Sequence, residues 1–333
     1  MCTDDAHTVV VTNANGRLGN NLIQIIKAVY MATALNATCV KFSPLLQTQQ
    51  HVGSIANLPD TLSIGSNALV ADAKCKKVAL SYQTPSGYGG NFWTNGCHGT
   101  TAYTAHRIAQ KYIAPHFRPQ FIHCAKSHAL DDNLLTIHLR GGDLLPGQHS
   151  YVNKWFWDQP PCWTYQNIIR SGGFKDVLVI TEPELHRGQI RHPCISWIRK
   201  YGVSSGVSVR VQSTSLIEDA CAIHRAKNLV LACSTFSESL AVLSGKAKQI
   251  YFYNAFRDKS AMNCNLWPNA SLYAFFGESA DDLYQNNVTA LIDYMETYQR
   301  FDGPHLVSKR ACARNIDGDW VVTRKTLLAL QKQ

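Results

Sequence analysis

Apolar positions along the chain switch repeatedly between the two-residue period of a strand and the 3.6-residue period of an amphipathic helix. Near the start, a β-branched apolar run over residues 8–12 leads through a glycine-containing turn into helical spacing over about residues 20–35. A second apolar run follows over residues 38–42. This order of strand, helix and strand predicts two parallel strands joined by a right-handed crossover.

The second half of the chain repeats the alternation more regularly. There we expect strands over residues 177–181, 207–211, 229–232 and 247–252, and helices over residues 163–171, 193–201, 216–226 and 236–243. Before it we expect a helix over residues 108–117 and a buried strand over residues 134–139. Pro119, Gly172 and Gly202 should end three of these helices, because proline and glycine interrupt helical backbone. Short strands separated by helices are typical of a doubly wound α/β architecture.

A chain of 333 residues exceeds the size at which a single hydrophobic core stops growing, so we expect two Rossmann-like lobes. The boundary should fall in the aromatic, proline-containing stretch 151–161. Residues 45–95 show weaker periodicity and predict short strands and loops. We expect a helix that begins near residue 289 and a short strand near Trp320. The tail beyond residue 290 should pack back on the lobes, across the first.

Composition narrows the class of protein further. With 45% hydrophobic and 17% charged residues the chain is globular, and its net charge of +9 suits an anionic substrate, a membrane surface or simply a soluble surface. No dense basic run with interleaved aromatic residues is present, which argues against nucleic-acid binding. We find no signal peptide and no apolar stretch of about 20 residues. This favours a cytoplasmic protein or a soluble fragment, or a secretory protein if the chain belongs to a longer one.

Eleven cysteines are scattered along the chain with no Cys-x-x-Cys pair, which argues against a zinc knuckle or a redox motif. Several lie inside apolar runs, where cysteine usually acts as a small buried hydrophobe. We therefore expect reduced thiols, with a few disulfides of a secretory enzyme as the alternative.

Three segments at the ends of predicted strands carry candidate chemistry. The first is Gly16-Arg17-Leu-Gly19-Asn20, where glycine permits a tight turn and the following helix offers unpaired N–H groups to an anion. An ordinary turn between a strand and a helix is the alternative. The dinucleotide-binding glycine pattern is absent.

The second segment is His138-Leu-Arg140-Gly-Gly-Asp143, which follows the strand over residues 134–139. Arg140 could bind a diphosphate through two hydrogen bonds and neutralise charge on a leaving group. Asp143 could orient Arg140 or accept a proton from an acceptor hydroxyl. A purely structural Arg–Asp pair at a turn is the alternative.

The third segment contains Ser234, Thr235 and Phe236 at a predicted helix start, where hydroxyls and backbone amides suit a phosphate or simply cap the helix. Thr181 and Glu182, after another strand, and Asp219, beside Glu218, are candidate contacts to a ribose or a base. The acids could equally favour the dipole of a helix N-terminus.

Motifs for several other chemistries are missing from the sequence. No Asp-x-Asp follows a strand, and Asp317-Gly-Asp319 reads as a turn in the tail. There is no Gly-x-Ser-x-Gly elbow, no phosphate loop with Lys-Ser/Thr and no His-Glu-x-x-His. Hydrolase, kinase and metalloprotease activities therefore lack their residues, and we expect no metal site.

Taken in order, the three segments resemble those of the fucosyltransferase superfamily. Gly16-Arg-Leu-Gly-Asn-Asn21 is similar to the Gly-Arg-Leu/Phe-Gly-Asn-Gln opening of α-1,2- and protein O-fucosyltransferases. The segment His138–Asp143 resembles their His-x-Arg-Arg-Gly-Asp motif, and residues 218–237 resemble the α-1,2 segment ending in Asn-Ser-Thr-Phe-Ser. Gly141 replaces the second arginine, and Glu238-Ser239 replaces a Trp-Trp pair.

The resemblance implies a GT-B fold of two Rossmann-like lobes facing a cleft, with GDP-fucose as donor, inversion at the anomeric carbon and no cofactor or metal. Residues 1–155 would form the acceptor-side lobe, 156–290 the donor-binding lobe and 291–333 the tail. Arg140 would bind the β-phosphate, Ser234 and Thr235 the diphosphate, and the Gly16–Gly19 turn with Asn20 would lie near donor and acceptor. His138 and Asp143 would shape the catalytic site.

The partners implied are a nucleotide-sugar donor and a glycan acceptor. Two alternatives to a fucosyltransferase remain open, namely a transferase that uses another nucleotide-sugar and a carbohydrate- or nucleotide-binding protein without turnover. The sequence does not indicate the acceptor, the linkage or the oligomeric state.

Overall fold

The computed structural model describes seventeen stretches of the chain. They are residues 8–11, 17–34, 37–48, 52–64, 74–75, 97–98, 102–126, 131–141, 159–182, 191–232, 234–255, 262–263, 270–277, 288–299, 302–307, 312–314 and 320–322. Among the residues singled out in the sequence, Gly16 and Asp143 lie outside these stretches, as does the turn expected at Asp317-Gly-Asp319.

The main structural unit is a seven-stranded sheet with strand order β13-β12-β10-β9-β6-β7-β8. Six of its strands are parallel, and β13 pairs antiparallel with β12 at one edge. The strands are β6 (Leu134–Leu139), β7 (Asp176–Thr181), β8 (Ser208–Gln212), β9 (Asn228–Leu231), β10 (Gln249–Ala255), β12 (Ser271–Gly277) and β13 (Asp302–Leu306). The predicted alternation of strands and helices over the second half is thus confirmed, and the chain is an α/β protein.

Strand β6 lies in the interior of this sheet, between β9 and β7. The sequence analysis placed it in the first lobe, whereas its pairing joins it to the strands of the second half. All six of its side chains are buried, because helices cover both faces of the sheet. The division of the chain into two lobes at residue 155 stays a prediction.

A smaller sheet of three strands is formed by β1 (Thr8–Val11), β2 (Cys39–Phe42) and β3 (Thr61–Ser63). Strands β1 and β2 are parallel and are connected through α1 (Leu18–Ala34), so the predicted strand–helix–strand unit is confirmed. Short strands form two further small sheets: β4 (Lys74–Cys75) with β5 (Cys97–His98), and β11 (Met262–Asn263) with β14 (Cys312–Arg314) and β15 (Trp320–Val322).

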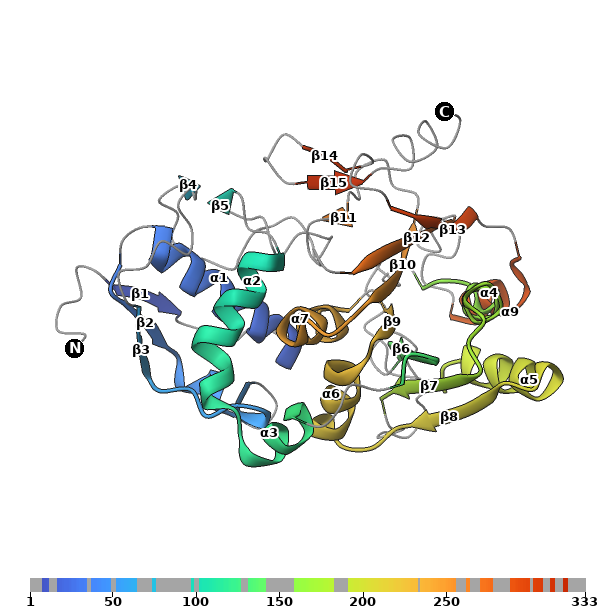
Figure 1. The fold of residues 1–333 in the computed structure, drawn as a ribbon, viewed down its shortest axis with the longest axis horizontal. Helices are drawn as coiled ribbons and strands as arrows, with labels where there is room; N and C mark the ends of the chain where they lie inside the picture. Colours follow the sequence, from blue (N-terminus) through green and yellow to red (C-terminus); the bar gives the residue numbers. More distant parts are fainter. Residues whose placement is uncertain are drawn as a thin grey trace.

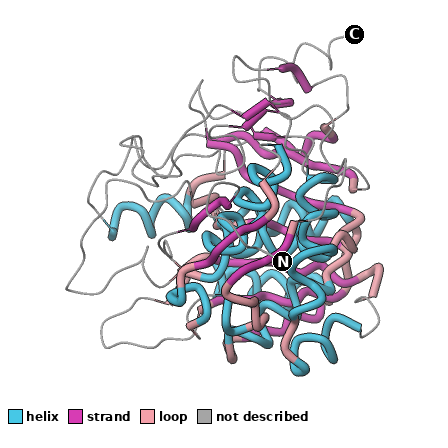
Figure 2. The backbone as a smooth tube through the Cα atoms, turned by 90° about the vertical axis from the view of Figure 1, so that its left-hand side faces the viewer, coloured by secondary structure: helices cyan, strands magenta, loops and turns pink. Residues whose placement is uncertain are grey.

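Helices lie in two layers on either side of the seven-stranded sheet (Figure 1). One layer lies between the seven-stranded sheet and the sheet of β1, β2 and β3. It contains α1, α2 (Ala102–Ile108), α3 (Pro119–Lys126), α6 (Leu216–Arg225) and α7 (Thr235–Ser244). The opposite face carries α4 (Cys162–Gly172), α5 (Cys194–Ser205) and α9 (Val288–Thr297). Figure 2 shows the molecule from the side of the sheet formed by β1, β2 and β3.

One hydrophobic core connects the two sheets. It contains Val40 and Phe42 of the small sheet, the apolar face of α1, and Leu229 and Ile250 of the large sheet. A second core lies on the other face of the large sheet and is formed with α4, α5 and α9. Both ends of α1 and α7 are therefore held by packing on two sides, which positions their N-termini.

One of the three predicted helix stops, at Gly202, is wrong, whereas the helical stretch before Pro119 does end, at His116. Helix α5 continues through Gly202 and ends at Gly206, whose φ is +70°. Gly202 is required for packing instead, because a Cβ there would lie 2.5 Å from Val209 Cγ2. Pro119 begins α3, where its missing N–H costs nothing; the expected helix over residues 108–117 is a π-helix (Ala109–Ile113) and a 3-10 turn (Ala114–His116).

The described part of the C-terminal tail packs against the large sheet and its helices, and its packing across the first lobe stays a prediction. Helix α9 packs against α4 and α5, and β13 extends the large sheet. The helix near residue 289 and the strand near Trp320 are both present, as predicted.

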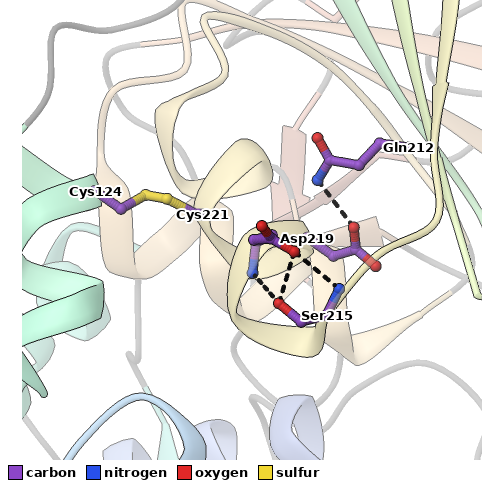
Figure 3. The surroundings of a disulfide bond; sticks show 6 residues. Cys124, Gln212, Ser215, Asp219 and Cys221 are labelled. Carbon is purple, nitrogen blue, oxygen red and sulfur yellow. Dashed lines mark hydrogen bonds between the residues drawn. A yellow bond between two sulfur atoms is a disulfide. The ribbon is translucent and has the colours of Figure 1, made fainter.

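The expectation of reduced cysteines is wrong. A disulfide joins Cys124 of α3 to Cys221 of α6 (Figure 3), and another joins Cys162 to Cys194 at the starts of α4 and α5. Cys39 is disulfide-bonded as well. No single apolar run in the sequence could show these pairs, since their partners lie 97 and 32 residues apart.

Within the described stretches, no helix is both long enough and apolar enough to span a bilayer.

Candidate functional site

The N-termini of α1 and α7 meet between the two sheets. A Cβ at Gly19 would lie 2.4 Å from the Phe236 backbone nitrogen and 2.5 Å from the Thr235 carbonyl carbon. Only glycine therefore allows the two first turns to approach so closely. The Thr235 hydroxyl donates a hydrogen bond to Asn20 Oδ1, which links the two helices directly.

The carboxyl end of β6 lies beside this junction. The ring of His138, near the end of the strand, is 5.4 Å from the ring of Phe236, measured between centroids. Arg140 and Gly141 follow the strand directly, and a Cβ at Gly141 would contact the Thr181 hydroxyl at 3.8 Å. The first and third sequence segments are thus adjacent to the second.

Strand β7 adds a charged contact to the same group. Leu139 pairs in register with Thr181, and Glu182 follows directly. Glu182 Oε1 accepts a salt bridge from Arg17 Nη1 at 2.7 Å. Both side chains are solvent-accessible, and such pairs contribute about 0–1 kcal/mol to stability. Glu182 therefore contacts Arg17 of the first segment, a partner that sequence spacing does not reveal.

Ser234 caps helix α7, which is the structural alternative to phosphate binding. Its hydroxyl accepts a hydrogen bond from the Phe236 N–H at 3.3 Å and so caps α7. The cap fixes the direction in which the first amides of α7 point. Because the α1 N-terminus abuts the same turn, the positive ends of two helix dipoles lie together.

His138 is neutral at physiological pH. Burial, together with the smaller effects of the charges of Arg140, His192 and Arg17, lowers the pKa of its imidazole from 6.5 to about 3. The influence of Arg17 and Arg140 on one ring shows that both guanidinium groups lie within electrostatic range of it. Two cations and two helix N-termini thus surround the carboxyl end of β6.

Asp219 lies in the first turn of α6, after the carboxyl end of β8, which is the strand next to β7. It is buried, and its Oδ1 accepts a hydrogen bond from Gln212 at 2.9 Å (Figure 3). The Thr214 hydroxyl donates to the same oxygen at 3.3 Å. Burial raises the pKa of this carboxyl, although the two hydrogen bonds oppose the rise. Glu218 instead caps the helix with Ser215, which confirms the structural alternative for that acid.

Two buried polar residues at this end of the sheet were missed by the sequence analysis, namely Gln159 and His192. Each precedes a proline and a disulfide-bonded cysteine, in Gln159-Pro-Pro-Cys162 and His192-Pro-Cys194. A polar residue next to such a cysteine is the signal that could have indicated them.

No group of three histidine, cysteine, aspartate or glutamate side chains forms a metal-binding arrangement in the stretches that the structure describes.

Three solved structures resemble part of the chain. A structure of POFUT1 in complex with GDP is 14% identical over 43% of this chain and 49% of its own length, with a TM-score of 0.29. The POFUT1 complex with GDP-fucose is 14% identical over 42% and 47%, with a TM-score of 0.29. Another GDP complex of POFUT1 is 16% identical over 44% and 49%, with a TM-score of 0.30.

The matched part of the chain thus spans about half the length of these structures. No protein-family model matches the chain. A search of curated proteins finds no match.

Gly19→Ala tests the close approach of α1 and α7. The added methyl meets backbone atoms, which cannot rotate away, so the two helix N-termini must separate. We expect the free energy of unfolding to fall by about 2–3 kcal/mol, as for overpacked cores, despite the better helix propensity of alanine. Denaturant unfolding followed by circular dichroism measures the change.

Gly141→Ala is the matched control, because its Cβ would make only an ordinary contact with Thr181. Its unfolding free energy should stay within about 0.5 kcal/mol of the wild-type value. Equal losses in both variants would contradict the specific contact assigned to Gly19.

Proposed function

We propose that this chain is an inverting, metal-independent fucosyltransferase that transfers fucose from GDP-fucose to a hydroxyl group of a glycan acceptor. The observation that carries the proposal is the junction of Gly19 and Asn20 with Thr235 and Phe236 beside the end of β6. The three segments that resemble fucosyltransferase motifs are far apart in sequence, yet they meet at this one place.

The electrostatics of the junction suit a diphosphate. Backbone amides of two helix N-termini and the guanidinium groups of Arg17 and Arg140 offer donors and positive charge. A diphosphate would replace Glu182 as the partner of Arg17, since an exposed ion pair is weak. The backbone amide of Thr235 would bind a phosphate oxygen, since the Phe236 N–H already donates to the Ser234 hydroxyl and the Ser234 N–H to the Ala232 carbonyl.

The nucleoside would extend towards β7 and β8. Asp219 is a buried acceptor held by Gln212 and Thr214, and such a carboxylate suits the N–H groups of a guanine base. Thr181 would lie close to the ribose. This arrangement would place the donor along the carboxyl ends of β6, β7 and β8, the usual ligand edge of a parallel sheet.

In the proposed reaction the acceptor oxygen forms a bond to C1 of fucose while the bond from C1 to the β-phosphate oxygen breaks. The proton of the acceptor hydroxyl passes to a base, for which Asp143 is the candidate, and Arg140 stabilises the charge on the departing GDP. Positioning and electrostatics carry the catalysis.

The disulfides favour an oxidising compartment for this enzyme, such as the secretory pathway. The large sheet would belong to the donor-binding lobe of a GT-B fold, and the three-stranded sheet to the acceptor-side lobe.

Thermal-shift titration with GDP, UDP and GDP-fucose tests the proposal. We expect GDP and GDP-fucose to raise the melting temperature and UDP to have little effect. The shift should survive EDTA, and so should fucose transfer to a panel of sugar acceptors read by mass spectrometry. A shift with UDP alone would favour another donor, and a shift without transfer or donor hydrolysis would favour a binding protein. No shift with any nucleotide would refute the donor site.

A further inference from the structure

Gln159 and His192 form a buried polar pair that the proposed function does not use. Only 2% of Gln159 and 3% of His192 is exposed. They directly precede the segments that begin α4 and α5, on loops that leave the carboxyl ends of β6 and β7. The charge of a protonated His192 would act on His138, so the pair lies close to the end of β6.

The hydrogen bonds of His192 define the orientation of the pair. The Cys194 N–H donates to His192 Nδ1 at 3.3 Å, so Nδ1 is an acceptor and the proton lies on Nε2. Burial lowers the pKa of His192 to about 3, in agreement with a neutral ring. Nε2 can then donate to Gln159 Oε1, which lies 3.5 Å away.

This orientation leaves the amide nitrogen of Gln159 without a partner. Gln159 Nε2 is buried and makes no hydrogen bond within the protein. A buried donor of this kind costs about 1–3 kcal/mol, and folded proteins rarely retain one without a reason. His138 Nδ1 and the Thr164 hydroxyl in the first turn of α4 are also buried without a partner.

The pair is held rigidly. The disulfide between Cys162 and Cys194 brings their Cα atoms to 4.8 Å, and these cysteines follow Gln159 and His192 closely in the sequence. The disulfide therefore ties the two loops to each other beside this side-chain pair. A donor that is oriented, buried and fixed in this way suits an oxygen atom of a bound molecule.

We propose that the amide of Gln159, oriented by His192, donates a hydrogen bond to an oxygen of the sugar of the nucleotide-sugar donor. This inference rests on the proposed function and extends it to sugar recognition. Gln159 and His192 are neutral, which suits an uncharged hydroxyl or ring oxygen. The cations Arg17 and Arg140 serve the phosphates instead.

Gln159→Leu in the full chain tests the proposal by calorimetric titration with GDP and with GDP-fucose. We expect affinity for GDP-fucose to fall about three- to tenfold, the effect of one neutral hydrogen bond, and affinity for GDP to stay unchanged. The melting temperature should stay equal or rise, because a partnerless buried donor is removed.

His192→Phe supplies a second variant, since it keeps an aromatic ring but cannot hold the Gln159 amide. It should reproduce the selective loss of GDP-fucose affinity. The matched control is His224→Phe: His224 is also buried with a partnerless Nδ1, but it packs against Phe121 between α6 and α3. That variant should change stability alone.

The outcomes separate this inference from the proposed function. If the wild-type protein binds both ligands and Gln159→Leu weakens neither or both equally, the amide serves only the fold, through a buried water, and the inference is overturned. If the wild-type protein binds neither ligand, the proposed function fails and this inference with it.

Discussion

Replacing Arg140 by alanine is expected to abolish fucose transfer and to weaken GDP binding by about tenfold or more. Hydrogen bonds to charged groups contribute about 1.5–3 kcal/mol, and loss of a group that stabilises developing charge typically lowers kcat by about 10²–10³. Arg140 follows β6 directly and lies within electrostatic range of His138 at the junction of α1 and α7. Steady-state transfer assays and GDP titration measure the two effects.

Arg140→Lys should be nearly as poor, because a lysine ammonium group cannot make two parallel hydrogen bonds to a diphosphate. Arg210→Ala is the matched control: it removes one exposed guanidinium group from β8 and should leave both measurements unchanged. Unchanged transfer in Arg140→Ala would refute the role assigned to this residue.

Mild acid should destabilise the protein strongly. Burial holds the pKa of His138, His192 and His224 at about 3, whereas each should titrate near 6.5 in the unfolded chain. Between these values the unfolded state binds more protons, so stability is intact above pH 6.5 and is lost as the pH falls towards 3. At pH 5 the loss is about 2 kcal/mol per histidine, or about 6 kcal/mol for the three.

Urea unfolding at several pH values between 7.5 and 5, a range chosen around the pKa of about 6.5 for free histidine, measures this loss. The raised pKa of Asp219 opposes the effect, because that carboxyl binds its proton more tightly when folded. His224→Gln should make the curve shallower by about one third, whereas His123→Gln, at an exposed position, should leave it unchanged. A flat curve for the wild-type protein would contradict the burial of these neutral rings.

Most helices and strands could be predicted because their causes are local. The buried run over Leu134–Leu139 and the glycines at 172–173 produced β6 and the end of α4 where expected. The helix end predicted at Gly202 was wrong, because the glycine there leaves room for the side chain of Val209, seven positions later in β8. Strands β12 and β13 were not predicted, although the aromatic run over Ser271–Gly277 is itself typical of a strand.

The same distinction between local and long-range causes applies to the residues of the candidate site. Arg140, Gly19 and Thr235 could be named from the sequence because each follows a strand or begins a helix. The pairing of Arg17 with Glu182, the hydrogen bond between Asn20 and Thr235, and the contact between Gln159 and His192 could not be named. Each joins residues from different elements, and periodicity within one segment carries no information about such partners.

By itself, the sequence determined the α/β class, the order of the elements and the three strand-end segments, because these follow from hydrophobic period and from glycine and proline at turns. Only the tertiary structure decided that β6 lies between β9 and β7, that at least five cysteines form disulfides, and that the first turns of α1 and α7 touch. Those outcomes depend on packing between elements far apart in the chain. Folding alone brings those elements together.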